Sequence, residues 1–131
     1  MAYDATTGVT PRPSRRRNAL LEALELFRAE DPNTRLSTVL AFLYLCENEG
    51  FCVSELAAAS GMTMATASRA ARSLIAPAAP GALAPALGLA ELRPQGKVRA
   101  LHLSAAGREL RDRLDETIVQ ATTIDQRRQV K

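Results

Sequence analysis

Two arginines and several short hydroxyl side chains share one stretch of the chain that contains no carboxylate. The stretch from 63 to 75 reads TMATASRAARSLI. At helical spacing Ala67, Ala71 and Leu74 fall on one face and the polar side chains on the other. Guanidinium and hydroxyl groups contact the phosphates and base edges of DNA. The outward face therefore predicts contact with DNA through Ala65, Thr66, Ser68, Arg69 and Arg72.

A second, shorter helix precedes this one, and the pair predicts a helix-turn-helix over residues 53–75. Ser54 is expected to cap the first helix, and Gly61 to end it because glycine tolerates the left-handed conformation. Thr63 then caps the second helix. Small alanines at 57, 67 and 71 allow the two helices to cross closely. The alternative is a solvated face of an ordinary helical hairpin.

Composition and charge agree with a helical protein that binds a polyanion. The chain has 131 residues, 47% of them hydrophobic and only 4% aromatic, which predicts one mainly helical domain. Its net charge is +3, and residues 60–103 hold five basic residues against one acidic residue. Such concentration is typical of a nucleic-acid footprint. With no long apolar run or signal-peptide core, the sequence predicts a cytoplasmic protein without membrane contact.

The patterns that would indicate an enzyme or a cofactor site are missing from the sequence. It has no phosphate-binding glycine loop, no dinucleotide fingerprint and no His–Cys nucleophile pair. Cys46, Cys52 and His102 are too few for a zinc site or a disulfide framework. We expect no enzyme activity, no metal and no cofactor. The cysteines are interpreted as inert and buried, with a redox-sensing thiol as the alternative.

The remaining elements follow from periodicity and from turn residues. We expect a disordered arm over 1–13, helices over 14–29 and 35–49, and a single sheet rung near Phe51. The proline-rich segment 76–88 is a semi-rigid connector. Strands over 89–93 and 98–103 then form a hairpin around a turn at 94–97, with basic Lys97 and Arg99 flanking its tip. Ser104 caps a last helix over 104–120, and 121–131 form a polar tail.

The two terminal helices carry apolar stripes for which so small a core offers no obvious partner. The first stripe is Leu20, Leu24 and Phe27, and the second is Leu110, Leu114 and Ile118. The second helix, 35–49, has the strongest apolar face and should be the buried central one. We therefore expect segments 14–35 and 104–120 to pair with a second copy of the chain.

The order of the elements predicts a mainly α winged helix-turn-helix with a small β-hairpin wing. A first helix is followed by the helix-turn-helix, the hairpin and a last, long helix. At residue level the chain resembles the MarR family of bacterial transcriptional regulators. VSELAAASGMTMATASRAARSLI is similar to the family's helix-turn-helix, GLAELR to its first wing strand, and LHLSAAGREL to the second wing strand entering the dimerisation helix. With the central helix, the resemblance covers about residues 36–114.

This resemblance implies a homodimer that binds double-stranded DNA, and we expect it to act as a repressor. Each recognition helix would enter a major groove, and each wing would lie beside a minor groove. Thr63 joins Thr66, Ser68, Arg69 and Arg72 at the family's contact positions, and Lys97 takes the place of a wing arginine. Many members bind small aromatic effectors, but no residue here identifies such a pocket. The connector is longer than in the family.

A winged-helix module that binds proteins instead of DNA, such as an antirepressor or an assembly subunit, is the alternative. The outward face of the second helix separates the two hypotheses. Arg69 and Arg72 without acidic neighbours favour DNA, whereas an apolar patch would have favoured protein.

Overall fold

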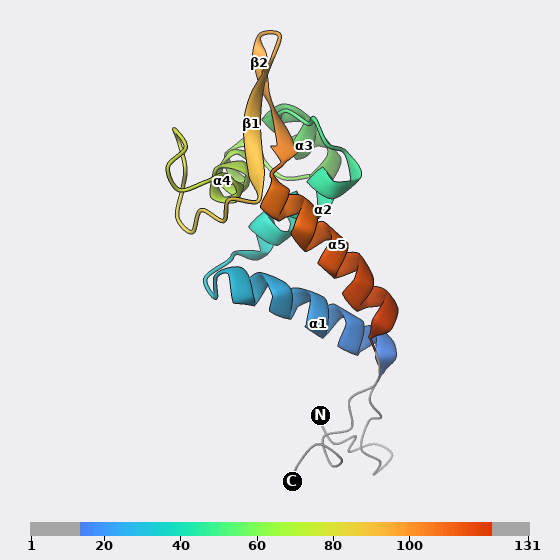
Figure 1. Ribbon diagram of the computed structural model, residues 1–131. Coiled ribbons are helices and arrows are strands. Elements are labelled where there is room, and N and C mark those ends of the chain that lie inside the picture. The colour runs from blue at the N-terminus through green and yellow to red at the C-terminus, as the bar shows by residue number, and fades with distance from the viewer. Residues whose placement is uncertain (1–13, 122–131) are drawn as a thin grey trace.

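Five helices and one β-hairpin make up the computed structural model, which describes residues 14–121 (Figure 1). The elements are α1 (Arg15–Glu30), α2 (Leu36–Glu47), α3 (Val53–Ser60), α4 (Met64–Leu74), β1 (Ala90–Gln95), β2 (Val98–Leu103) and α5 (Ala105–Gln120). This confirms the predicted mainly α fold with a small β wing. The arm predicted over 1–13 lies outside the described residues, as does the tail predicted over 121–131 apart from Ala121, which is buried.

The helix-turn-helix forms where the local sequence signals place it, with one correction at its start. Helix α3 begins at Val53, so its cap is Cys52 and not the predicted Ser54. The Glu55 carboxylate accepts a hydrogen bond from the Cys52 backbone N–H at 3.0 Å, and this bond lowers the pKa of Glu55. Gly61 ends α3 with a φ of 76°, and Thr63 caps α4 by accepting from the Thr66 N–H at 3.1 Å.

The core lies between the helix-turn-helix, α2 and the base of the hairpin. Helix α4 buries Ala67, Ala71 and Leu74 completely or nearly so, as its periodicity predicts. Phe42 and Leu45 of α2 are buried in the same cluster. The segment 35–49 is predicted to have the strongest apolar face, yet three leucines of α2 are exposed, namely Leu36, Leu40 and Leu43. That face was assigned too broadly, because a helix in so small a core is covered on one side only.

The hairpin is longer and its turn tighter than predicted. β1 pairs antiparallel with β2 from Ala90 opposite Leu103 to Gln95 opposite Val98. Two residues, Gly96 and Lys97, therefore form the turn, and Gly96 takes the positive φ of 63° that such a turn favours. The expected extra rung is present, because the Leu101 backbone bonds to Gly50 and Phe51 at 2.8 and 2.7 Å. Ala100 of β2 is buried as well.

The connector after α4 folds back onto that helix. The backbone N–H groups of Leu83 and Leu87 donate to the carbonyls of Arg72 and Ser73 at 3.0 Å each. The buried Ser73 hydroxyl is also shared between the Leu83 and Pro85 carbonyls at 3.2 and 2.8 Å. The connector is thus attached to the second half of α4, beside which it forms a long loop in Figure 1.

Helices α1 and α5 have partners within the chain, which corrects the expectation that neither does. They pack against each other, and Phe27, Leu110 and Leu114 are buried in the shared core. The Arg15 guanidinium strengthens this contact by donating to the Val119 carbonyl at 2.7 Å. The predicted stripes are therefore divided between the core and the surface. Exposed apolar side chains remain on α1 and at the end of α5, namely Leu20, Leu21, Leu24, Ile118 and Val119.

Candidate nucleic-acid interface

The exposed face of α4 holds the side chains predicted to contact DNA. Thr63, Ala65, Arg69 and Arg72 are exposed, and Thr66 and Ser68 are half-buried. The helix has no acidic residue in its first turn, and its N-terminus carries the positive end of the helix dipole. All six predicted residues therefore lie on one short helix whose surface offers hydrogen-bond donors and positive charge.

The two arginines of α4 differ in what they contact. Arg69 makes no hydrogen bond or ion pair with any residue from 14 to 121. In contrast, Arg72 Nε donates to the Gly81 carbonyl of the connector at 2.7 Å. Arg69 is the side chain that can reach a ligand without breaking a contact. The other guanidinium N–H groups of Arg72 can still donate to a ligand, but the bond to the connector fixes the position of this side chain.

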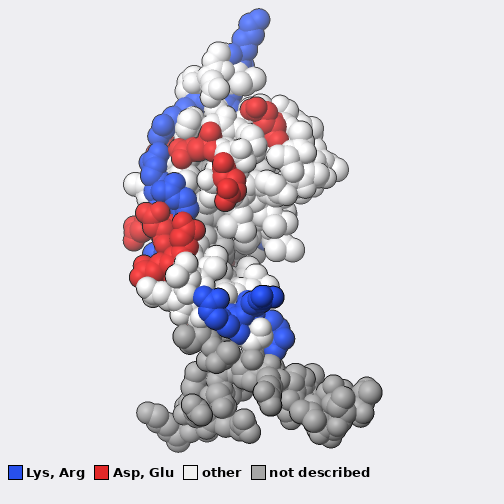
Figure 2. Space-filling model, turned by 90° about the vertical axis from the view of Figure 1, so that its right-hand side faces the viewer, with Lys and Arg blue, Asp and Glu red and all other residues white. Residues whose placement is uncertain are grey.

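The wing extends basic residues away from the body of the molecule. Lys97 occupies the two-residue turn itself, so it lies at the very tip instead of beside it. Arg99 is exposed on β2 and donates weakly to the Leu92 carbonyl at 3.4 Å. On the face drawn in Figure 2, a basic side chain projects at the top of the molecule, and farther down Lys and Arg side chains lie next to Asp and Glu side chains. The positive charge at the tip suits a polyanion running past it.

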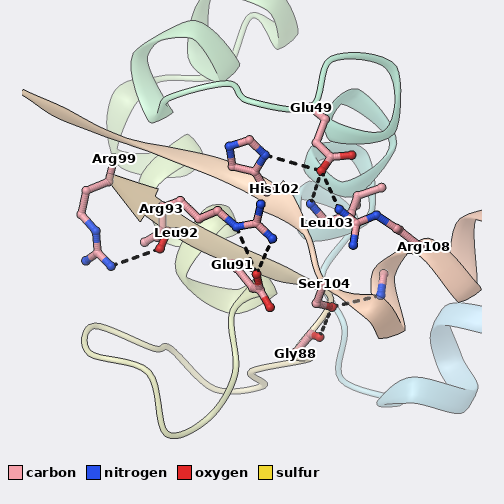
Figure 3. A network of polar contacts seen from close by, with 11 residues as sticks. Glu49, Gly88, Glu91, Leu92, Arg93, Arg99, His102, Leu103, Ser104 and Arg108 are labelled. Atoms are coloured by element: carbon pink, nitrogen blue, oxygen red, sulfur yellow. Dashed lines mark hydrogen bonds and ion pairs between the residues drawn. The ribbon is translucent and has the colours of Figure 1, made fainter. Parts of the chain in front are cut away.

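A single carboxylate, Glu49, joins the end of α2 to the wing and to α5 (Figure 3). One of its oxygens accepts from the Leu103 N–H and from the Arg108 guanidinium, each at 3.2 Å. His102 Nδ1 lies 3.5 Å from the same oxygen. These contacts tie the base of β2 to two helices and fix the direction in which the hairpin points.

The cysteines and the described acidic residues offer little other chemistry. Burial raises the pKa of the Cys46 thiol to about 11, against an ordinary value of 9.0. Both cysteines are free and half-buried. Within residues 14–121 no group of three His, Cys, Asp or Glu side chains could hold a metal ion. None of the helices there is long and apolar enough to cross a membrane.

The fold is similar to that of two solved bacterial proteins. A MarR-family transcriptional regulator from Silicibacter pomeroyi matches with a TM-score of 0.52 and 21% identity, over 79% of this chain and 61% of that one. BpsR of Bordetella bronchiseptica, whose DNA binding is regulated by 6-hydroxynicotinic acid, matches with a TM-score of 0.50 and 16% identity, over 79% and 73%. No protein-family model and no curated protein matches the sequence. The predicted MarR-like winged-helix fold is confirmed.

The chain spans only about three-fifths of the Silicibacter regulator.

Two parts of the surface next to α4 are not predicted by the sequence. Arg35, which precedes α2, lines the same cavity as Arg69, and the connector forms one wall of that cavity. No local pattern predicts either feature, because each depends on segments that are distant in sequence.

Proposed function

We propose that the protein binds double-stranded DNA as a dimeric bacterial transcriptional regulator. Helix α4 is the recognition helix and enters the major groove, while the wing lies along the backbone. Binding to a promoter would repress transcription by occupying it. The observation that carries this proposal is the exposed face of α4, where the unengaged Arg69 guanidinium lies among hydroxyl groups without any carboxylate.

The wing supports the proposal from a different part of the chain. Lys97 stands at the tip of a hairpin whose base is held by Glu49, so its charge is presented at a fixed distance from α4. A cation in this place interacts with phosphates and reads no sequence. The resemblance to MarR regulators implies that the helix contacts base edges and the wing contacts the DNA backbone.

Self-association is part of the proposal because DNA sites of such regulators repeat with the symmetry of the protein. Leu20 and Leu24 on α1 are 62% and 39% exposed, and Ile118 on α5 is 47% exposed. These side chains remain on the outside after α1 and α5 have packed together. A second copy that covers them would remove this apolar surface from water.

Gel-shift titration against the DNA that flanks the protein's own coding region tests the proposal. We expect saturable binding that is tighter than binding to unrelated duplex of equal length. Affinity for both should fall as salt rises, because counterions are released when phosphates are contacted. Equal, weak and salt-insensitive binding to every duplex would contradict the proposal and favour the protein-interaction alternative.

A further inference from the structure

A cavity of about 210 Å³ opens where the start of α2, the middle of α4 and the connector meet. Arg35, Ser37 and Thr38 line it from α2, and Thr66 and Arg69 line it from α4. Leu83 of the connector closes one side. Its lining includes two guanidinium groups and several hydroxyls but no carboxylate, so its chemistry suits an anion.

The N-terminus of α2 lies beside this cavity, which Ser37 lines, and carries backbone N–H groups that have no partner in the described chain. Its cap residue, Arg35, makes no side-chain cap, and the first turn contains no acidic residue. The N–H groups of Leu36 and Ser37 donate to no residue between 14 and 121. The positive end of the helix dipole is therefore unneutralised beside the cavity.

The Thr38 side chain adds an unpaired hydroxyl to the lining of the cavity. Thr38 is only 2% exposed and lines the cavity, and its hydroxyl forms no hydrogen bond within the described part of the chain. This oxygen is not sealed from water, so its hydrogen-bonding capacity is open to a polar ligand in the cavity.

Helix α4 adds donors from the opposite side. Thr66 Oγ1 already accepts from the Thr63 hydroxyl at 3.0 Å, so its own hydrogen is free to donate. The side chains of Arg69 and Arg35 form no hydrogen bond or ion pair with described residues. The Arg35 guanidinium, the hydroxyl donors and the helix N–H groups match the oxygens of a phosphate, which leaves Arg69 for the base contact proposed above.

We propose that this cavity binds one phosphate group per protomer. The neighbouring recognition face makes the DNA backbone its first source, an assignment that rests on the proposed function. A soluble phosphate ester that competes with DNA is the second source and would act on the same donors. The connector determines the site, because the bonds from Arg72 and Ser73 hold Leu83 over it.

Titration with inorganic phosphate at constant ionic strength, followed by amide NMR, tests the cavity without DNA. We expect saturable shifts of the Leu36 and Ser37 amides. Binding should weaken about tenfold or more in Arg35→Gln, which alters an exposed side chain, and in the near-isosteric Thr38→Val. Arg113→Gln, on the exposed face of α5, is the matched control and should bind phosphate as the wild type does.

The salt dependence of DNA binding then identifies the source of the phosphate. If the backbone occupies the cavity, Arg35→Gln should reduce the slope by about 0.9 per protomer more than Arg113→Gln does. Phosphate binding with an unchanged slope would assign the cavity to a soluble ester. No saturable phosphate shift would overturn the proposal, whatever Arg35→Gln does to DNA binding. A wild type that binds no DNA would overturn the proposed function alone, because the phosphate titration still decides the cavity.

Discussion

At the scale of single residues, the charges of this protein differ in how freely they can meet a ligand. The side chains of Arg72 and Arg99 each donate to a carbonyl of their own chain, whereas those of Arg69 and Lys97 form no hydrogen bond or ion pair with described residues. Arg69 lies on α4, where a DNA groove would pass, and Lys97 lies at the wing tip, where a DNA backbone would pass. The intramolecular bonds of Arg72 and Arg99 indicate that these two side chains support the binding surface.

Removing the charge at the wing tip should weaken binding to every DNA sequence alike. Lys97→Ala takes away one phosphate contact per protomer and no base contact, so the salt slope should fall by about 0.9 for each protomer. Fluorescence anisotropy across a salt series measures this slope, with Arg113→Ala as the control. A slope equal to that of the wild type would show that the tip does not touch the backbone.

Cys46 should resist oxidation and alkylation at neutral pH. With its pKa raised to about 11 from an ordinary 9.0, the folded protein holds about a hundredfold less thiolate at pH 8 than the unfolded chain. The stability gained from the protonated thiol is complete below pH 9.0 and is lost as the pH rises through about 11.

Timed alkylation of a Cys52→Ser variant, folded and in urea, measures this difference directly. Peroxide treatment should likewise leave the DNA affinity of the wild type unchanged. Rapid labelling of Cys46 in the folded protein would favour the redox-sensor alternative.

At the scale of the elements, the chain and a helix approach each other closely where the connector ends and α5 begins. Ser104 caps α5 through the Gly107 N–H at 3.0 Å and donates to the Gly88 carbonyl at 2.6 Å (Figure 3). A Cβ placed on Gly107 would lie 2.0 Å from the Leu89 carbonyl oxygen. Only glycine lets this helix approach the chain so closely.

Gly107→Ala should therefore lower the free energy of unfolding by about 3 kcal/mol. Helix propensity alone predicts the opposite sign, a gain of about 1 kcal/mol. Urea denaturation measures the change, and Ala106→Gly at the exposed neighbouring position gives the propensity effect by itself. A stabilised Gly107→Ala protein would show that the contact between α5 and Leu89 is absent in solution.

Local signals account for the elements that the sequence predicts correctly. Gly61, Thr63 and Ser104 end or cap their helices through bonds to residues within four positions, so composition and spacing suffice. The contacts of the connector with Arg72 and Ser73 and the cavity next to Arg35 join distant segments. No periodicity encodes them. The expectation that the apolar stripes on α1 and α5 have no partner in the chain was wrong for a related reason, because an apolar face in the sequence does not reveal whether the same chain covers it.

At the scale of the whole molecule, the remaining exposed leucines predict the dimer. Leu20→Glu combined with Leu24→Glu changes side chains that are 62% and 39% exposed, so the protomer should stay folded. Sedimentation should show a dimer for the wild type and a monomer for this variant, because burying unpaired charges in an interface is costly.

Val98→Glu introduces the same charge at the wing, where Val98 is 50% exposed, and it should remain a dimer. A double variant that sediments as the wild type would place the interface elsewhere on the chain.

The central claim is that α4 reads DNA through its exposed face, and Arg69→Ala tests it most directly. The side chain is exposed and forms no hydrogen bond or ion pair with described residues, so its loss should leave folding unchanged by circular dichroism. Against the cognate site, anisotropy should show a loss of about 1–3 kcal/mol per base contact, with relaxed preference at one base pair of each half-site. Arg113→Ala should match the wild type. A folded Arg69→Ala protein that binds every duplex as the wild type does would contradict the assignment of α4 as the recognition helix.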